Sequence, residues 1–526
     1  MALKLTKEVF IVGAKRTPFG GFGGALKDFT ANDLQTHANV AAMAQAGVDP
    51  SLVDSVCVGN VMQSSSDAAY IARHSALRAG IDKATPCLTV NRLCGSGFES
   101  INMIAMEIEL GMTQIGIGGG AESMSQAPYA LRGARFGTRL GQDLKLEDTL
   151  WAGLTDQNIK LPMGITAENL AVQYGITMEE ANAHAYQTQQ RWLAANEAGH
   201  FKAEMAPMDV KIRRKPVSMD FDEHPKPQTT LEQLNKLKPV FKKDGTVNAG
   251  NASGVCDGAA AVVVASAEAV KAHNLTPLAR IVSFASAGCE PKVMGIGPVP
   301  ATKQALAAAG LTLDQMDLIE VNEAFAPQFL AVQKELGLDN DKTNLCGGAI
   351  AIGHPLGASG TRITGHLAHA LNRTGSKYAL GSACIGGGQG ITIILNSLMT
   401  ATDTIGSRKS GRSWKTSKKP IHTMTPKGAN SQKKWKAKMD EKLRMHQMKM
   451  REREIIAQRN EEKEAERIRI EEKKRQQEEN EWKQAKSQGQ IVTDAKKIKK
   501  LEAKEIKQKK RAARRKSKMK GPSKLK

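Results

Sequence analysis

The first 400 residues of this 526-residue chain predict an α/β protein. Short runs rich in β-branched residues, such as 55–59 and 87–90, alternate with alanine-rich stretches such as 68–79. This alternation is typical of buried strands that are connected by helices. A second series of the same kind runs from residue 279 to residue 382, so we expect two similar α/β halves.

The stretch between the two series has a different character. Residues 125–248 contain seven prolines and many charged residues, and they lack the regular alternation of the flanking parts. We expect this stretch to be an insertion that covers one face of the protein, where a large ligand binds.

The basic charge of the chain belongs to its last part. Residues 401–526 carry 41 Lys and Arg against 17 Asp and Glu, a net charge of +24, whereas residues 1–400 have a net charge of −2. All seven cysteines and every Phe and Tyr lie in the first 400 residues. Only that part has the composition to bury a large core.

Cysteine usage and apolar runs indicate the compartment and exclude several classes of protein. The seven cysteines are widely spaced and include no Cys-x-x-Cys pair, so we expect a reducing compartment and neither a disulfide framework nor a metal site. No apolar run approaches the roughly 18 residues of a membrane-spanning helix. The N-terminus leads straight into the strand-like residues 9–12, so we expect any organelle-targeting signal to be uncleaved.

Cys94 is a candidate nucleophile. It lies in residues 91–97 (NRLCGSG), between a strand-like run and a helix expected at 98–110. A nucleophilic cysteine must be a thiolate, and a free thiol with a pKa of about 8.5 is only a few per cent ionised at neutral pH. The free N–H groups of the helix would face the sulfur and lower its pKa. The alternative is a small buried hydrophobic residue, the commoner role of a cysteine.

His354 and Cys384 lie in glycine-rich contexts near the end of the α/β region. Glycine on both sides of His354 lets a substrate approach, and Pro355 favours a helix start beside the imidazole, which could take the proton of Cys94. Cys384 precedes three glycines, Gly386 among them, whose amides could bind an enolate-like oxygen while the thiol transfers a proton. A structural histidine and a tightly packed glycine turn are the alternatives.

Asn322 and the glycines of residues 116–121 form two further motifs. Asn322 ends a strand-like run, where its amide could orient a water or a carbonyl group. The glycines of residues 116–121 match the spacing of a dinucleotide-binding turn, but Pro128 interrupts the helix that such a site needs, and basic residues stand where its acidic residue belongs. We therefore expect no nicotinamide cofactor.

Taken together, the segments around Cys94, Asn322, His354 and Cys384 resemble the thiolase family, in this order and with the family's glycine contexts. The similarity covers about residues 5–397 and is greatest to the mitochondrial type of 3-ketoacyl-CoA thiolase. It implies a five-layered αβαβα fold of two pseudo-repeated halves with an inserted loop domain, assembled as a homodimer or homotetramer. It also implies CoA thioesters as substrates, with CoA and acyl-CoA as reactants and no permanently bound cofactor.

Composition and the resemblance together set the expected domain boundaries. They are an N-terminal half at 1–124 and 249–277, an inserted CoA-binding loop domain at 125–248, a C-terminal half at 278–398, a linker at 399–430 and a basic helical tail at 431–526.

The resemblance implies a role for each candidate. Cys94 would attack the ketone carbon of a 3-ketoacyl-CoA and hold the shortened acyl group, and Cys384 would protonate the departing acetyl-CoA enolate. His354 would activate Cys94 and, with a water held by Asn322, stabilise the thioester oxygen. The amides of Cys94 and Gly386 would form the other oxyanion hole. The expected activity is an acyltransferase of fatty-acid β-oxidation; a biosynthetic acetoacetyl-CoA thiolase with the same residues is the alternative.

For CoA itself, the matching positions are Lys226, Thr229 and Ser253. The family relatives place Arg where Lys226 stands. Because Lys lacks the planar fork of a guanidinium, we expect CoA to bind somewhat more weakly while activity is kept.

The basic tail predicts a different kind of partner. Residues 432–488 have no helix breaker, and stretches such as 410–415 and 490–499 resemble a small nucleolar coiled-coil family of ribosomal-RNA processing. Residues 431–526 would attract RNA or a nuclear-import receptor, or act as a charged extension without a dedicated partner. The first part thus predicts a mitochondrial location and the tail a nucleolar one. A genuine fusion, two joined genes, and a nucleolar RNA-associated protein remain alternatives.

Overall fold

The structure is a computed structural model and describes residues 2–212 and 215–398. The predicted linker at 399–430 and the predicted basic tail at 431–526 lie outside the described residues. Within the part that is described, no helix is both long enough and apolar enough to cross a membrane.

Five strands form the sheet of the first half. In sheet order they are β4 (Cys87–Val90), β3 (Ser55–Gly59), β5 (Ile115–Ser123), β12 (Cys256–Ser266) and β1 (Ala2–Arg16). The β4–β3 and β3–β5 pairs are parallel, whereas β5–β12 and β12–β1 are antiparallel. The short strand β2 (Gly20–Gly21) pairs with the start of β12.

The second half repeats this order. Its strands are β14 (Leu318–Val321), β15 (Tyr378–Ile385), β16 (Gln389–Asn396) and β13 (Ala279–Gly288). The β14–β15 pair is parallel, and β15–β16 and β16–β13 are antiparallel, as in the first half. A single parallel bridge from Ile319 to Thr343 occupies the place that β4 has in the first half. The two predicted α/β halves are therefore pseudo-repeats, joined by antiparallel pairing of β1 with β13.

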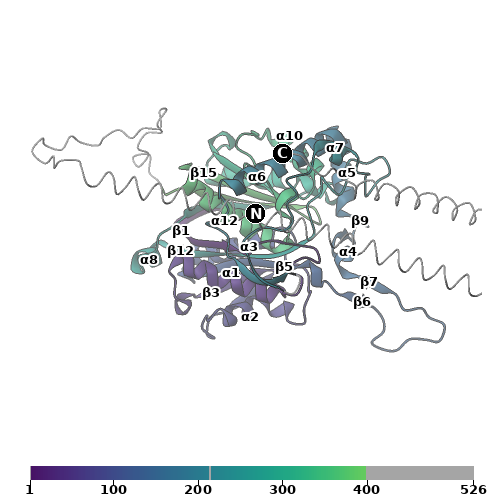
Figure 1. Cartoon of the computed structure of the whole chain (residues 1–526). Helices are drawn as coiled ribbons and strands as arrows, with labels where there is room; N and C mark the ends of the chain where they lie inside the picture. Colours follow the sequence, from purple (N-terminus) through teal and green to yellow (C-terminus); the bar gives the residue numbers. More distant parts are fainter. Residues whose placement is uncertain (1, 213–214, 399–526) are drawn as a thin grey trace, which may run out of the picture. The chain divides into compact units, whose positions relative to one another are not determined.

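Helices complete five layers. The helices α3 (Ser96–Glu109) and α12 (Leu356–Thr374) pack against each other between the two sets of strands, and α12 contacts strands of both halves. The helices α1 (Ala31–Ala46) and α2 (Ile71–Arg78) cover the outer face of the first half. On the second half, α9 (Pro298–Ala309) lies against β13 and β16, with α10 (Ala326–Leu336) beside it. Figure 1 shows α3 and α12 between the purple first half and the green second half.

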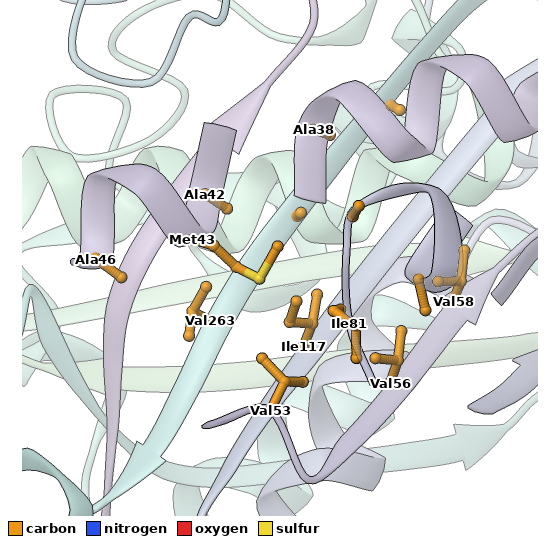
Figure 2. Close-up of a cluster of buried hydrophobic side chains, with 14 of the residues drawn as sticks. Ala38, Ala42, Met43, Ala46, Val53, Val56, Val58, Ile81, Ile117 and Val263 are labelled. Carbon is orange, nitrogen blue, oxygen red and sulfur yellow. The ribbon is translucent and has the colours of Figure 1, made fainter. Parts of the chain in front are cut away.

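The outer helix α1 illustrates how the sequence fixes this packing. Thr30 and Asp33 form a capping box at its start, and Gly47, with φ of 67°, ends it. The apolar part of its inner face consists of alanines, Leu34 and Met43, which pack in one cluster with valines and isoleucines of the sheet (Figure 2). Small side chains at Ala38, Ala42 and Ala46 let the helix approach the strands closely.

The segment between β5 and β12 is an insertion, because these two strands are hydrogen-bonded neighbours. It holds α4 (Thr149–Gly153), α5 (Met163–Tyr174), α6 (Met178–Glu197), α7 (Leu231–Asn235) and the strand pairs β6–β7 (Tyr129–Leu131, Leu146–Asp148), β8–β9 (Thr155–Asp156, Leu161–Pro162) and β10–β11 (Met208–Ile212, Lys215–Met219). The boundaries at 125 and 248 stay a prediction. The remaining helices are α8 (Ala267–Ala272) and α11 (Ala349–Ile352).

Glycines allow α3 and α12 to cross at backbone contact. A Cβ atom at Gly97 would lie 2.6 Å from the Thr361 nitrogen and 2.7 Å from the Gly357 oxygen. A Cβ atom at Gly360 would collide with the Phe98 nitrogen in the same way. Since real Cβ atoms do not approach backbone atoms this closely, the crossing requires glycine on both helices.

Substituting Gly97→Ala should therefore destabilise the fold, although alanine is the better helix former. We expect a loss of about 1–3 kcal/mol in the free energy of unfolding, because the backbones of α3 and α12 must separate. The matched control is Gly288→Ala, where the new Cβ would meet only the Gly388 oxygen at 3.9 Å. Urea unfolding of both variants measures the difference, and equal stabilities would contradict the constraint.

Candidate active site

Cys94 sits on a sharp turn between β4 and α3. Leu93 before it has φ of 48°, a left-handed conformation that costs a residue with a side chain about 1–2 kcal/mol. The Asn91 Oδ1 atom accepts the Leu93 N–H at 3.0 Å, and the Ser96 N–H bonds the Leu93 oxygen at 2.9 Å. These bonds hold the turn, and the turn places Cys94 two residues before the first residue of α3, next to the N-cap residue Gly95.

Two backbone amides point at the Cys94 sulfur. They belong to Gly386 and to Cys94 itself, and both stabilise the thiolate. Burial has the larger effect, however, and with a smaller contribution from Glu122 it raises the pKa of Cys94 to about 11. The prediction that the helix start lowers this pKa is therefore wrong for the resting protein, because the loss of water around the sulfur outweighs the amide dipoles.

His354 is buried and held in one tautomer. Its Nδ1 atom lies 2.6 Å from the Ser359 Oγ atom. Ser359 donates its single hydroxyl hydrogen to the Pro355 oxygen at 3.1 Å, so Oγ must accept the hydrogen of Nδ1. The Nε2 atom then carries the lone pair, which faces the Nδ2 atom of Asn322 at 3.4 Å and can accept a proton. Pro355 is the N-cap residue of α12, as the sequence predicted for the helix start.

The imidazole of His354 is neutral in this environment. Burial, and then the charge of Arg362, lower the pKa of His354 to about 3. Arg362 lies on α12, the helix that follows His354, and it forms an ion pair with the buried Glu320 of β14. A neutral ring is the form that can accept a proton from a thiol.

Asn322 lies beside His354 and keeps one polar atom open. Its Nδ2 atom is 3.4 Å from the Nε2 atom of His354, and its backbone N–H bonds the Ser382 oxygen at 2.9 Å. The Oδ1 atom is buried yet has no hydrogen-bond partner among the described residues. A buried acceptor without a partner is costly, so this atom suits a bound water or a polar ligand group.

Cys384 adds a second thiol to the Cys94 side of the site. It is fully buried near the end of β15, two residues before Gly386. Burial, the nearby Cys94 and Cys289 all raise the pKa of Cys384 well above its usual range. Cys384 is therefore a protonated thiol at rest, and its conjugate base would be strong.

The helix crossing joins the Cys94 side to the His354 side. The Cys94 turn starts α3, and the His354 turn starts α12, and the first turns of both helices meet at Gly97 and Thr361. Cys94 also packs in one apolar cluster with Leu356, two residues after His354. The structure thus brings the five predicted catalytic positions to one region.

The predicted CoA positions lie near a pocket of about 400 Å³. Lys226 lines it together with Phe22, Leu150 and Val255. Leu150 and Val255 also pack in the apolar cluster of Cys94, so this pocket shares a wall with the catalytic cysteine.

The other two predicted CoA positions do not line this pocket. Ser253 directly precedes Gly254 and Val255, which line the pocket, and it donates its N–H to the Ala324 oxygen at 3.0 Å. Thr229 closes a turn by donating its N–H to the Lys226 oxygen.

Two residues of the site were missed by the sequence analysis. Ser359 fixes the tautomer of His354, and its place one turn into α12 was the only available signal. Glu122 is fully buried and accepts N–H groups from Met62 at 2.8 Å and Gly357 at 2.9 Å, which ties the start of α12 to β5. Burial raises the pKa of Glu122 to about 7. No sequence pattern around Glu122 indicates this role.

The depressed pKa of His354 should make the fold sensitive to acid. Between pH 6.5 and pH 3 this histidine binds a proton in the unfolded chain but not in the folded chain. The free energy of unfolding therefore falls as the pH falls. The penalty grows by about 2 kcal/mol between pH 7 and pH 5.

In urea titrations at both pH values, His354→Asn should lose about 2 kcal/mol less than the unsubstituted chain on acidification. The exposed His273→Asn serves as the control and should behave like the unsubstituted chain. Identical acid losses in all three proteins would refute the buried neutral imidazole.

Comparisons with known proteins agree with this geometry. Two family models match the chain: the thiolase N-terminal domain over residues 9–268 and the thiolase C-terminal domain over residues 275–397. Human mitochondrial 3-ketoacyl-CoA thiolase is 62% identical over 395 residues, which cover 75% of this chain and 100% of the relative. An acetyl-CoA acetyltransferase of Pseudomonas aeruginosa is 47% identical over 394 residues, or 74% of this chain and 99% of the relative.

Solved structures show the same relationship. The crystal structure of human mitochondrial 3-ketoacyl-CoA thiolase superposes with a TM-score of 0.74 and 63% identity, covering 75% of this chain and 100% of that chain. The structure of the human enzyme in complex with CoA gives a TM-score of 0.73 and 62% identity, covering 75% and 99%. The αβαβα layers, the two neighbouring free thiols of Cys94 and Cys384, and these matches together show that the chain belongs to the thiolase family.

Proposed function

We propose that this chain is a 3-ketoacyl-CoA thiolase, which uses CoA to cleave a 3-ketoacyl-CoA into acetyl-CoA and a shortened acyl-CoA. The observation that carries the proposal is the Cys94 sulfur, which faces the Gly386 amide and lies beside the second thiol, Cys384. Identity of 62% over the full length of a mitochondrial 3-ketoacyl-CoA thiolase supports it.

The first step forms a bond between the Cys94 sulfur and the ketone carbon. At rest the thiol carries its proton, and the neutral His354 takes that proton as the sulfur attacks. Negative charge then develops on the former ketone oxygen. The N–H groups of Cys94 and Gly386, which already point toward the sulfur, donate to that oxygen.

The second step breaks the bond between the ketone carbon and its α-carbon. The shortened acyl group stays on Cys94 as a thioester, and acetyl-CoA leaves as an enolate. His354 and a water at the open Oδ1 atom of Asn322 stabilise the enolate oxygen. Cys384 donates its proton to the carbon, because its buried thiol stays protonated until a strong base appears.

Transfer of the acyl group to CoA completes the cycle. The proton that His354 took from Cys94 first passes to the Cys384 thiolate, which restores both groups to their resting forms. The thiol of a second CoA then gives its proton to His354 and attacks the Cys94 thioester. The sulfur of Cys94 leaves and takes that proton back from His354. Splitting the reaction through an acyl-enzyme replaces one difficult step by two easier ones.

The pocket that Lys226 lines is the proposed entry for CoA. Its lysine offers a positive charge for a phosphate, and Leu150 and Val255 continue from the pocket into the apolar cluster of Cys94. The cofactor's apolar and thiol end would follow this wall. Ser253 and Thr229 are proposed as further contacts on either side.

The relatives support a proposal for the location of the protein. Because the human and rat relatives, at 62% and 63% identity, are mitochondrial enzymes, we propose a mitochondrial location. The homodimer or homotetramer remains a prediction from the resemblance to the family. The comparisons give no support to a nucleolar location, and RNA binding by residues 431–526 remains a prediction outside the described residues. The acetoacetyl-CoA alternative is not favoured, since acetyl-CoA acetyltransferases match at the lower identities of 44–47%.

Trapping the acyl-enzyme tests the proposal. The full chain is incubated with 3-ketooctanoyl-CoA without CoA, digested with trypsin and analysed by mass spectrometry. We expect a hexanoyl adduct on the peptide 93–132, whose single cysteine is Cys94, and its loss on addition of CoA. Cys384→Ser should form the adduct at least about 100-fold more slowly, because the enolate lacks its proton donor.

Two outcomes would refute this mechanism. One is an adduct on another cysteine with none on Cys94, and the other is an unchanged rate in Cys384→Ser. Comparing kcat/KM on acetoacetyl-CoA and on 3-ketooctanoyl-CoA separates the two thiolase activities, and a strong preference for the shorter substrate would favour the biosynthetic alternative.

Replacing Lys226 by arginine should improve CoA binding. A guanidinium offers two parallel donors to a phosphate where the ammonium offers a point charge, so we expect KM for CoA to fall about threefold with kcat unchanged. The matched control is Lys236→Arg, which lies in the same inserted segment but outside the pocket. An unchanged KM for CoA in Lys226→Arg would show that Lys226 does not contact the cofactor's phosphates.

A further inference from the structure

A buried carboxylate directly follows Asn322 in the chain and has no part in the proposed chemistry. Glu323 is fully buried. Its side chain accepts hydrogen bonds from four residues, His184, Thr188, Asn344 and Ile350. Because a buried carboxylate is costly unless it is paired and hydrogen-bonded, we ask what these bonds achieve.

The first carboxylate oxygen, Oε1, fixes the strand end that presents Asn322. The Nε2 atom of His184 on α6 donates to Oε1 at 3.2 Å, and the Nδ2 atom of Asn344 donates to it at 2.8 Å. Asn344 also exchanges two hydrogen bonds of 2.9 Å with the backbone of Val321. The residues on both sides of Asn322 are therefore held by the same asparagine.

The second carboxylate oxygen, Oε2, reaches the helix that leads to His354. It accepts the N–H of Ile350 in α11 at 3.2 Å. The Thr188 hydroxyl donates to the carboxylate, 3.0 Å from Oε2, and accepts the Gly348 N–H at 2.8 Å. The carboxylate of Glu323 and its threonine partner thereby hold α11, which ends two residues before His354.

Packing and charge leave this carboxylate little freedom. A Cβ atom at Gly348 would lie 2.4 Å from the carboxyl carbon of Glu323. His184 stacks on Phe329 of α10 with ring centroids 4.3 Å apart, which restricts rotation of the imidazole. Burial opposes ionisation, but the bonds and charge of its partners, His184 first, hold the pKa of Glu323 below its usual range. Glu323 is therefore an anion that accepts from all its donors.

Glu323 connects the two groups of the proposed enolate site. Asn322 is its neighbour in the chain, and His354 follows the helix that its carboxylate holds. The Asn322 Nδ2 atom and the His354 Nε2 atom are 3.4 Å apart, and a shift of either element changes this distance. Donors stabilise developing charge only when they stand where the oxyanion forms, so small displacements there slow a reaction strongly.

The Cys94 side of the site is positioned by other elements. Cys94 stands between β4 and α3, and Gly386 directly follows β15. None of the four residues that donate to Glu323 belongs to β4, α3 or β15. A change at Glu323 should therefore disturb the enolate site more than the oxyanion hole beside Cys94.

We propose that Glu323 is a positioning residue, which sets the spacing between Asn322 and His354 and thereby the stabilisation of the acetyl-CoA enolate. This inference rests on the proposed function. It predicts that a change at Glu323 slows carbon–carbon cleavage more than acyl transfer between sulfur atoms, because only the cleavage forms an enolate. A merely structural role predicts equal losses in both.

The test compares two reactions of the full chain. The first is thiolysis of 3-ketooctanoyl-CoA, which passes through the enolate. The second is exchange of the hexanoyl group between hexanoyl-CoA and labelled CoA. In the exchange, the Cys94 sulfur takes the acyl group from one CoA and passes it to the other, and no carbon–carbon bond breaks.

Glu323→Gln keeps the shape of the side chain but places an NH₂ group among N–H donors. We expect thiolysis to fall at least about 10-fold, which is less than the loss of an oxyanion donor itself costs, while exchange falls less than about threefold. Thr188→Val leaves the carboxylate and removes the hydroxyl between Glu323 and Gly348. It should lower thiolysis about threefold relative to exchange.

The matched control is Glu168→Gln. Glu168 of α5 is also a buried carboxylate, and it accepts the N–H groups of Thr246 and Val247 at 2.8 Å each. It bonds none of the elements that Glu323 joins, so the ratio of the two rates should stay unchanged.

Equal losses in the two reactions of Glu323→Gln, or unchanged thiolysis, would overturn the positioning role. If Glu323→Gln does not fold, Thr188→Val decides by the same comparison. An unsubstituted chain that performs neither reaction refutes the proposed function and this inference with it. Failure of the inference alone leaves both reactions intact in the unsubstituted chain.

Discussion

The site depends on the backbone contact between α3 and α12. Each half of the protein contributes one of these helices, and each helix begins two residues after a reactive residue, Cys94 or His354. Because Gly97 and Gly360 carry no side chain, the backbones of the two helices touch and their starts come together between the sheets. A cysteine and a histidine that are 260 positions apart in the chain thereby share one chemical environment.

Burial then sets the protonation of that environment. It raises the pKa values of Cys94 and Cys384 and lowers that of His354, so all three groups are uncharged at rest. In such a site the two thiols stay protonated and the imidazole stays neutral until charge develops on a bound substrate.

Much of the fold was predictable, because strand alternation, Pro355 and the glycine contexts are local signals. The αβαβα fold is confirmed by the matches to thiolases of known structure. Local signals could not reveal Ser359 or Glu122, whose roles depend on partners from other elements, and they gave the wrong direction for the Cys94 pKa. The glycines at 116–120 mimic a dinucleotide turn, yet they lie in β5, where a Cβ at Gly118 would meet the Ile101 backbone at 2.8 Å.

The insertion between β5 and β12 separates two tasks within one chain. Its ends are clamped by neighbouring strands from Ser123↔Asp257 to Ile115↔Ala265, so its length and sequence can change at little entropic cost to the sheet. The residues proposed for chemistry lie outside it, and those proposed to grip the cofactor lie within it or at its edge. Evolution or engineering can therefore replace the inserted segment, and with it change the range of accepted thioesters, while the reactive sulfur keeps its geometry.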